Sequence, residues 1–298
     1  MSRNNVAHLG PVRLCTLVAP DLGAAIAAYR DSLHTVVAEQ TQVSGELAEL
    51  WGSPTLCGSR MALLANACGE VWLRIVEDIG CPRPTPLQHH GWLALELLVA
   101  DVDVLAAELA DSAFTLLRPP ANLDLSDSIR ACQVSGPCGE VLYLTQVKAP
   151  VPPFDLPQAR CAVDRLFIPI ICTPDRQAAA DFYARLAGVE PLFFTTKITV
   201  LNQAYSWNID RQHPVATLQL AGQCLLEIDQ IEAASHRVCP PGRLPPGIAV
   251  VSVAVVDIER LAVDWKVPPR PVSDAPYGGK KVGLVRGAAG EWLELIET

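Results

Sequence analysis

The stretch 274–297, DAPYGGKKVGLVRGAAGEWLELIE, decides the fold of this chain. Its second half predicts a β-hairpin: an apolar run at 281–286, a turn at 287–290 and a second run at 292–296. Glycine and small residues between two short apolar runs are typical of a tight hairpin turn. We therefore expect the chain to end in two antiparallel strands.

One acid interrupts the second of these runs. Glu294 alternates onto the same strand face as Trp292 and Ile296. An acid on a buried face is usually either paired or functional. Two interpretations stay open: a general base for proton transfer, or a structural carboxylate paired with Arg286 across its own hairpin.

The Gly-Glu-apolar pattern that starts the last strand also occurs at Gly69 and Gly139. It belongs to a larger repeat, because the chain shows four units of an apolar strand, a helical pattern and further strands. The opening strands are expected at 12–22, 92–99, 166–172 and 248–256, the helices at 22–33, 101–109, 176–186 and 257–264, and proline-rich links at 81–86, 149–157 and 239–247. Such units are too small to bury a sheet face alone, so they must pair. We predict two domains, 1–150 and 158–298.

Composition excludes several classes of function. The chain has 298 residues and a formal net charge of -9, which gives no basic footprint for nucleic acid. No apolar run reaches the roughly 18 residues of a membrane span, and the start lacks the apolar core of a signal peptide. We expect a cytoplasmic protein with a small-molecule ligand, no nucleic-acid or membrane partner, and a homodimer as an open alternative to a monomer.

With these repeats, the sequence resembles the vicinal oxygen chelate superfamily, which includes glyoxalases, bleomycin-resistance proteins and extradiol dioxygenases. The phrases that carry the resemblance are LVAPDL, LLVADVDVL, IICTPD, AVVDIERL and the closing hairpin PYGGKKVGLVRGAAGEWLELIE. The resemblance covers nearly the whole chain. It implies an α+β fold of four βαβββ modules, paired into two incomplete barrels that each curl around a pocket.

In the metal-dependent members, a His or Gln of the opening strand and a Glu of the closing strand hold an ion. Counting seven residues back from each capping Asp, and four on from each turn Gly, gives these positions: Leu14, Ala94, Ile168, Val250, Leu73, Tyr143, Leu226 and Glu294. A shift of one residue brings in Arg13, Cys15, Arg74 or Glu227. A lone carboxylate does not hold a catalytic ion, so we predict no metal and no other cofactor. The alternative is a metal with displaced ligands, Glu294 with His213 or His236.

The resemblance and the apolar strands together select candidate site residues. For proton transfer they are Glu294, Glu96 and Tyr143, and for substrate binding they are Tyr277, Trp92, Trp292, Arg286 and Ser252. Glu96 stands in an apolar strand, where the structural alternative is a buried ion pair with Arg74 or Arg118. The predicted function is a metal-independent isomerase or lyase acting on a small hydrophobic carbonyl compound. The alternatives are a sequestering protein of the bleomycin-resistance type and a metal-dependent dioxygenase or lyase.

Overall fold

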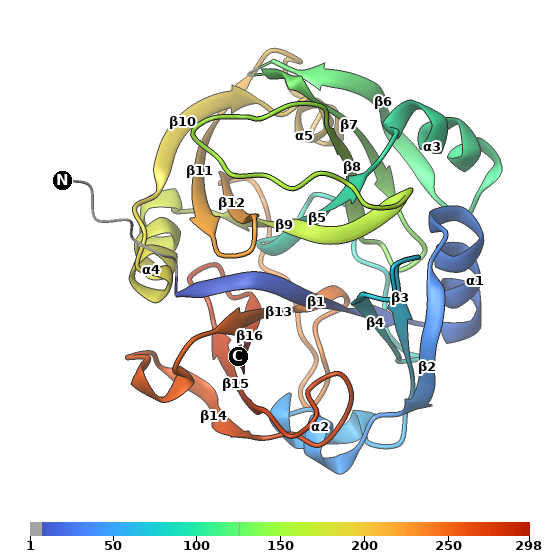
Figure 1. Ribbon diagram of the computed structural model, residues 1–298, viewed down its shortest axis with the longest axis vertical. Coiled ribbons are helices and arrows are strands. Elements are labelled where there is room, and N and C mark those ends of the chain that lie inside the picture. The colour runs from blue at the N-terminus through green and yellow to red at the C-terminus, as the bar shows by residue number, and fades with distance from the viewer. Residues whose placement is uncertain (1–7, 125) are drawn as a thin grey trace.

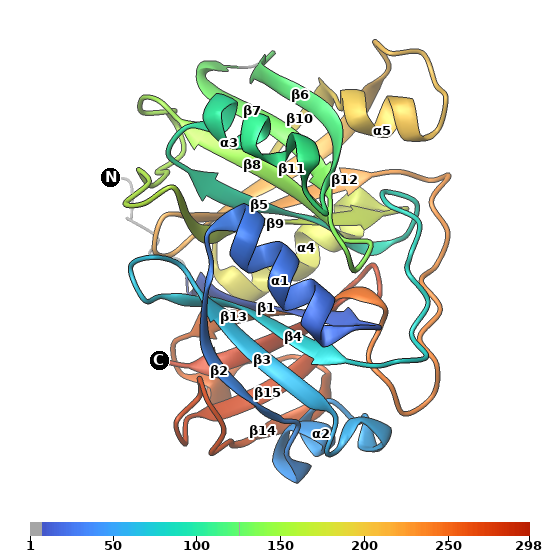
Figure 2. The ribbon, with the colours of Figure 1, turned by 90° about the vertical axis from the view of Figure 1, so that its right-hand side faces the viewer.

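The computed structural model describes residues 8–124 and 126–298 and contains two eight-stranded sheets (Figure 1). Each sheet curls around its own concave face, and the convex faces of the two sheets lie toward each other. Figure 2 shows the two sheets stacked with α1 (Leu22–Leu33) and α4 (Arg176–Ala187) between them. The prediction of an α+β fold of four βαβββ modules in two incomplete barrels is confirmed.

Sheet A combines the first and the fourth module. In spatial order its strands are β14 (Trp265–Pro271), β15 (Lys281–Arg286), β16 (Trp292–Glu297), β13 (Gly247–Val255), β1 (Leu9–Ala19), β4 (Val71–Glu77), β3 (Arg60–Ala65) and β2 (Val36–Gln42). The antiparallel pair of β1 and β13 joins the two modules at the centre. The closing hairpin β15–β16 pairs as the turn residues predicted.

Sheet B combines the second and the third module. In spatial order its strands are β10 (Leu192–Lys197), β11 (Gln212–Leu220), β12 (Cys224–Gln230), β9 (Val163–Thr173), β5 (Gly91–Val99), β8 (Val141–Val147), β7 (Ser126–Ser135) and β6 (Thr115–Leu123). Here the central antiparallel pair is β5 with β9. The two sheets are therefore built on the same plan.

This pairing differs from the predicted division at residues 1–150 and 158–298, which joined consecutive modules. The link between β8 and β9 stays within sheet B, whereas the links after β4 and β12 cross from one sheet to the other. Proline-rich links show where modules end, but backbone hydrogen bonds are the same for any partner strand. The links therefore do not determine which modules pair with one another.

Helices flank the sheets on both faces. Asp21 and Asp175 cap α1 and α4 through their side chains, as their places before each helical pattern predicted. The helix expected at 257–264 is instead a single 3-10 turn, η3 (Ile258–Arg260), because Asp257 has φ 58° and β14 follows at once. No helix in the described part of the chain is long and apolar enough to cross a membrane.

Three further helices complete the modules. The helix α3 (Val102–Glu108) follows β5, and its cap Asp101 accepts hydrogen bonds from two backbone N–H groups of its first turn. Two short helices that the sequence did not predict, α2 (Gly45–Leu50) and α5 (Thr199–Ala204), lie over the concave faces. Together with the sheets they enclose one apolar interior per module pair.

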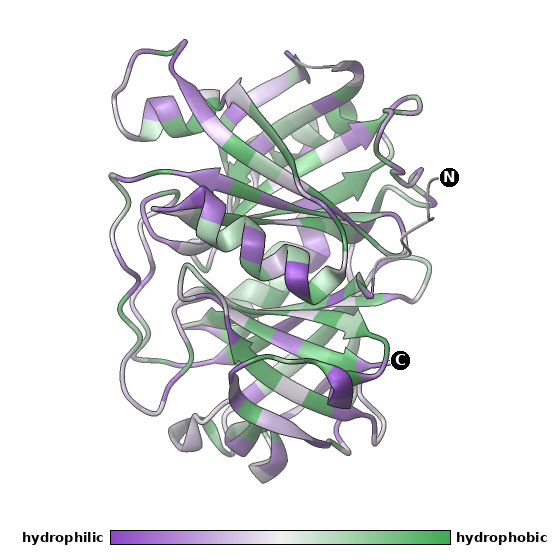
Figure 3. Ribbon diagram, turned by 90° about the vertical axis from the view of Figure 1, so that its left-hand side faces the viewer, coloured by the Kyte–Doolittle hydropathy of each residue, from purple (hydrophilic) through white to green (hydrophobic). Residues whose placement is uncertain are grey.

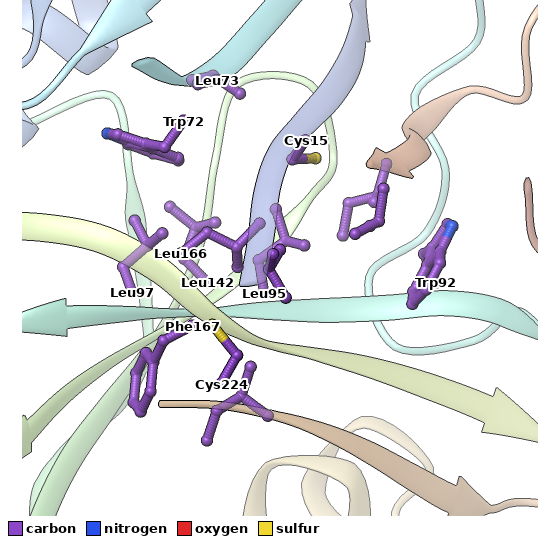
Figure 4. Packing of buried hydrophobic residues seen from close by; sticks show 14 of the residues in the cluster. Cys15, Trp72, Leu73, Trp92, Leu95, Leu97, Leu142, Leu166, Phe167 and Cys224 are labelled. Atoms are coloured by element: carbon purple, nitrogen blue, oxygen red, sulfur yellow. The ribbon is translucent and has the colours of Figure 1, made fainter. Parts of the chain in front are cut away.

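The main core lies between the convex faces, where the side chains in Figure 4 meet. Apolar residues are concentrated in the strands of both sheets (Figure 3). Two buried tyrosines cross this core at related places: the hydroxyl of Tyr29 donates to Glu140 (2.6 Å) and that of Tyr183 donates to Glu291 (2.7 Å). The repeated Gly-Glu motif therefore ties a helix of one module to the hairpin of the next.

Candidate functional site

The residues that face into each barrel lie five positions before the helix-start aspartates. These residues are Thr16, Glu96, Ile170 and Ser252, and their partners on the parallel closing strands are Arg74, Tyr143, Glu227 and Glu294. The sequence prediction counted seven positions back. Side chains of a strand alternate with period two, so that count selected the correct face but the wrong level along each opening strand.

In sheet A, Glu294 is the centre of a closed polar cluster. Its carboxylate accepts hydrogen bonds from Trp51 Nε1 (3.2 Å), Ser252 Oγ (2.5 Å) and the Tyr277 hydroxyl (2.7 Å). A guanidinium nitrogen of Arg74 lies 3.5 Å from its Oε1. The predicted residues Glu294, Tyr277 and Ser252 are thus brought together, but as partners of one another.

Arg74 fills the middle of this cluster. It donates through Nε to Thr16 Oγ1 (2.9 Å) and through Nη1 to the Tyr277 hydroxyl (2.6 Å). Its guanidinium lies 4.6 Å from the ring centre of Trp51. Burial acts to lower the pKa of Arg74, but Tyr277 and Glu294 together raise it above its ordinary value. The positive charge is therefore retained and balances the carboxylate.

Sheet A does not fit the metal ion that the resemblance implies. Its four inward positions hold a threonine, an arginine, a serine and a single glutamate, and the fixed cation is the guanidinium of Arg74. Arg74 and Glu294 are both 0% exposed, so neither side chain reaches solvent. The displaced ligand pairs of Glu294 with His213 or His236 do not form, because His213 lies in sheet B, bonded to Asn202, and His236 lies against His90. Among residues 8–124 and 126–298, no group of three or more His, Cys, Asp or Glu side chains is placed to hold an ion.

The other predicted binding residues, Trp92, Trp292 and Arg286, take no part in the polar cluster of either sheet. The indole of Trp92 donates to the carbonyl of Trp292 (2.8 Å), which joins the two sheets. Arg286 is exposed and donates weakly to the carbonyl of Gly290 (3.4 Å), so the predicted pair with Glu294 is wrong. These residues line a cavity of about 30 Å³, room for one water molecule rather than a substrate.

Sheet B gathers three carboxyl groups around a tyrosine. Glu96 accepts a hydrogen bond from Thr145 Oγ1 (2.9 Å) and stands beside Tyr143 on the neighbouring strand. Glu227 and Asp229 alternate along β12 and face the same side. Asp229 is buried beside Glu227, and the hydroxyl of Tyr143 has no hydrogen-bond partner. The predicted ion pair of Glu96 with Arg74 is wrong, since Arg74 belongs to sheet A.

Burial shifts the protonation of this group. Burial, and then the neighbouring Glu227, raise the pKa of Glu96 to about 8. Burial raises the pKa of Glu227 to about 7 and that of Asp229 well above its ordinary value. Burial, and then the charges of Asp229, Glu227 and Glu96, raise the pKa of Tyr143 well above its ordinary value. These shifts move the pKa values of Glu96 and Glu227 toward neutral pH.

The two faces differ in access to solvent. Glu96 and Glu227 are partly exposed, whereas Asp229 is buried and the Tyr143 side chain is 8% exposed. The same concave face continues into an apolar patch of which Ala94, Leu201 and Val215 are members. Sheet B therefore has two partly exposed acids, Glu96 and Glu227, beside an apolar cluster of side chains.

Sequence reasoning missed part of both clusters. Arg74 and Glu227 were considered only as one-residue shifts, and Asp229 and Trp51 were not considered. A signal for two of them was present, because Glu227 and Asp229 occupy alternate positions in the apolar run 224–230. No local pattern marked Trp51, which reaches Glu294 from the end of an unpredicted helix.

Comparisons with solved structures find proteins of the same fold. No protein-family model and no curated protein matches the sequence. Glyoxalase I from Zea mays superposes with a TM-score of 0.61 and 15% identity, covering 96% of this chain and 92% of that one. A putative dioxygenase from Bacillus subtilis subsp. subtilis str. 168 superposes with a TM-score of 0.65 and 11% identity, covering 98% and 86%. At such low identity the likeness concerns the fold alone.

Proposed function

We propose that this protein, which has the fold of the vicinal oxygen chelate superfamily, is a proton-transfer enzyme that works on the concave face of sheet B. The observation that carries the proposal is the group of three carboxyls, with raised pKa values, around the unpartnered hydroxyl of Tyr143. Groups that titrate near the working pH are the most effective general acids and bases.

Each member of the group has a role in such a reaction. The ionised form of Glu227 takes a proton from a carbon beside the substrate carbonyl, and the C–H electron pair moves onto the carbonyl oxygen. The hydroxyl of Tyr143 donates a hydrogen bond to that oxygen as its negative charge develops. Glu96, protonated at neutral pH, returns a proton at another atom of the substrate. This sequence balances as an isomerisation, or as a lyase reaction if a leaving group departs instead.

We place the site in sheet B rather than sheet A because solvent reaches the acids of sheet B and because these acids can gain and lose protons. Glu294 accepts three hydrogen bonds and lies against Arg74, with no part of its side chain open to solvent. A substrate would have to displace Trp51 and Tyr277 to reach it. We therefore assign the sheet A cluster a structural role, and the role of general base passes from Glu294 to Glu227.

The class of substrate that suits sheet B follows from the apolar side chains beside the acids. The partly exposed apolar side chains packed against the apolar patch of this sheet, Leu117, Phe194 and Trp207, favour a small, largely hydrophobic carbonyl compound, because ligand sites are lined by apolar side chains with a few placed polar groups. The proposed steps use no metal ion. Elemental analysis of the purified protein tests this part, and a stoichiometric transition metal that is required for activity would refute it.

Deuterium exchange tests the proton transfer directly. In D₂O, NMR spectroscopy should show enzyme-dependent exchange of protons beside the carbonyl in at least one compound of a panel of small ketones and aldehydes. Glu227→Gln and Glu96→Gln should slow this exchange by ~100-fold or more, as expected for loss of a general base or acid. Glu190→Gln, at an exposed position after α4, is the matched control. Saturable binding without exchange by any compound would instead favour the sequestering function.

A further inference from the structure

Two cysteines from distant parts of the chain meet where the two sheets adjoin. Cys68 is an exposed residue of the turn between β3 and β4 in sheet A, and Cys161 is a half-buried residue just before β9 of sheet B. The side chains of Cys68 and Cys161 are hydrogen-bonded to each other. Both cysteines are free, so this contact joins two thiols.

Contacts on both sides of the cysteines hold the two segments together. Two residues before Cys68, the side-chain amide of Asn66 donates to the backbone carbonyl and to the carboxylate of Asp164 (2.8 and 2.9 Å), and both residues are buried. Two residues after Cys68, Glu70 forms an ion pair with Arg160 (2.5 Å), the neighbour of the second cysteine. The meeting of the thiols therefore follows from the backbone of both segments and not from one side-chain rotamer.

The turn that carries Cys68 is also closed by its own hydrogen bonds. Asn66 Oδ1 accepts from the backbone N–H groups of Cys68 and Glu70 (2.9 Å each), and Gly69 takes the positive φ of 81° that the turn requires. A disulfide forms without backbone movement where two cysteine side chains converge from fixed backbones. Side-chain rotation is therefore enough to bring these two sulfur atoms to bonding distance.

The second module shows that the exposure of Cys68 is particular to its turn. The sequence Cys-Gly-Glu occurs at 68–70 and again at 138–140. In the second copy the thiol is buried, and Glu140 accepts a hydrogen bond from Tyr29 inside the main core. In the first copy the glutamate pairs with Arg160 at the surface instead, and the thiol is exposed. Of these two matching cysteines, a reagent in solvent therefore meets Cys68.

We propose that Cys68 and Cys161 are a peroxide-sensitive pair that forms a reversible disulfide between the two sheets. The Cys68 thiolate attacks one oxygen of hydrogen peroxide, so that an S–O bond forms, the O–O bond breaks and the second oxygen leaves as water with the proton that the thiol lost. The Cys161 sulfur then attacks the Cys68 sulfur. The S–S bond forms, the S–O bond breaks, and the hydroxide leaves as water with the Cys161 proton. Two thiols thus lose two electrons to one peroxide.

The surroundings of the two thiols set this order of events. Burial, and then the hydrogen bond with Cys68, raise the pKa of Cys161 to about 11. The Cys161 thiol also donates to the carbonyl of Val163 (3.2 Å). Cys161 therefore keeps its proton at neutral pH, and the thiol form reacts slowly with oxidants. Cys68 is attacked by peroxide first, and Cys161 resolves the sulfenic acid that results.

The disulfide connects parts of the chain that pair with different partners. It joins the first module to the third across the two sheets and closes a loop of roughly 90 residues. A cross-link over a loop of this length restricts the unfolded chain strongly, so the oxidised protein should melt on the order of 5–10 °C above the reduced protein. In a reducing compartment such a bond is transient, which suits a sensor of oxidants.

Mass spectrometry of the full chain tests the proposal. Hydrogen peroxide should lower the intact mass of the reduced protein by about 2 Da, and dithiothreitol should restore it. Peptide mapping without reduction should show one linked pair, residue 68 with residue 161. Cys161→Ser should prevent the mass loss and leave a sulfenic acid on Cys68 that dimedone traps. Cys57→Ser, at another exposed thiol, is the matched control and should leave the reaction unchanged.

The contrary outcomes are equally distinct. A linked pair of other cysteines, for example Cys81 with Cys239, overturns the proposal, and so do chains joined to one another through Cys68. A gain of about 32 Da on Cys68 while Cys161 is present overturns it too, because Cys161 then does not resolve the sulfenic acid. A melting temperature that falls on oxidation shows that the bond opposes the fold and refutes the cross-link. Peptide mapping of the unaltered chain decides the question even if a serine variant does not fold.

Discussion

Replacement of Arg74 by methionine tests whether the sheet A cluster is structural. The change removes the cation that lies 3.5 Å from Glu294 and leaves that carboxylate buried. Three donors remain, from Trp51, Ser252 and Tyr277, but none of them carries charge. Removal of one partner of a buried ion pair costs about 3–5 kcal/mol, because the other charge stays uncompensated. We expect a loss of this size in the free energy of unfolding.

A second replacement isolates the pair itself. In Arg74→Met/Glu294→Gln both charges are gone, and the amide can still bond to Ser252 and Tyr277. We expect the double variant to recover at least about 2 kcal/mol relative to the sum of the two single variants. With roughly 2–4 °C of melting temperature per kcal/mol in a chain of this size, Arg74→Met should melt about 10 °C below the parent protein.

Urea unfolding followed by tryptophan fluorescence provides the measurement. The matched control is Arg30→Met, which breaks an exposed pair with Asp31 whose side chains are 56% and 59% exposed. Such pairs contribute about 0–1 kcal/mol. A loss for Arg74→Met no larger than that for Arg30→Met, or strictly additive single losses, would refute the structural role of the pair.

Three further predictions concern protonation and single hydroxyl groups. Glu96 and Glu227 have folded pKa values of about 8 and about 7 against 4.5 as the ordinary value, so the folded chain binds more protons in this range. The free energy of unfolding should therefore fall, on the order of 6 kcal/mol, from pH 5 to pH 9, and urea titrations of Glu96→Gln should show a flatter profile. Tyr183→Phe removes the hydroxyl donor of the buried Glu291 and should cost about 1–3 kcal/mol; calorimetric melting checks this, and an unchanged melting temperature would contradict it. Tyr143→Phe should lower deuterium exchange by ~100-fold with little change in ligand affinity, and a loss of affinity alone would assign Tyr143 to binding.

Much of the local architecture could be predicted from the sequence. The strand 281–286, the turn at 287–290 and the helix 22–33 lie where the pattern of glycine, capping aspartate and apolar residues predicted them. The exception is 257–264, where the same signals gave only a short turn. Local signals succeed because caps and hairpin turns are satisfied within a few residues.

The candidate site could be predicted only in part. Glu96 and Tyr143 were identified from their strands and do lie together in sheet B, but Glu227 and Asp229 joined them from another module. Glu294 was identified as an unusual acid, yet its main partner, Arg74, comes from the other end of the chain. An unusual side chain on a strand face is visible in a sequence, whereas the residue opposite it depends on which strands pair.

The sequence by itself determined four modules and the inward face of each opening strand. Strand periodicity and helix caps are short-range properties, so these features are written in consecutive residues. The tertiary structure decided that the first module pairs with the fourth and the second with the third. Backbone hydrogen bonding between strands is not specific to sequence, so this choice depends on the packing of the whole chain. That choice places the Arg74 charge against Glu294 in sheet A and brings Glu227 and Asp229 to the acids of sheet B.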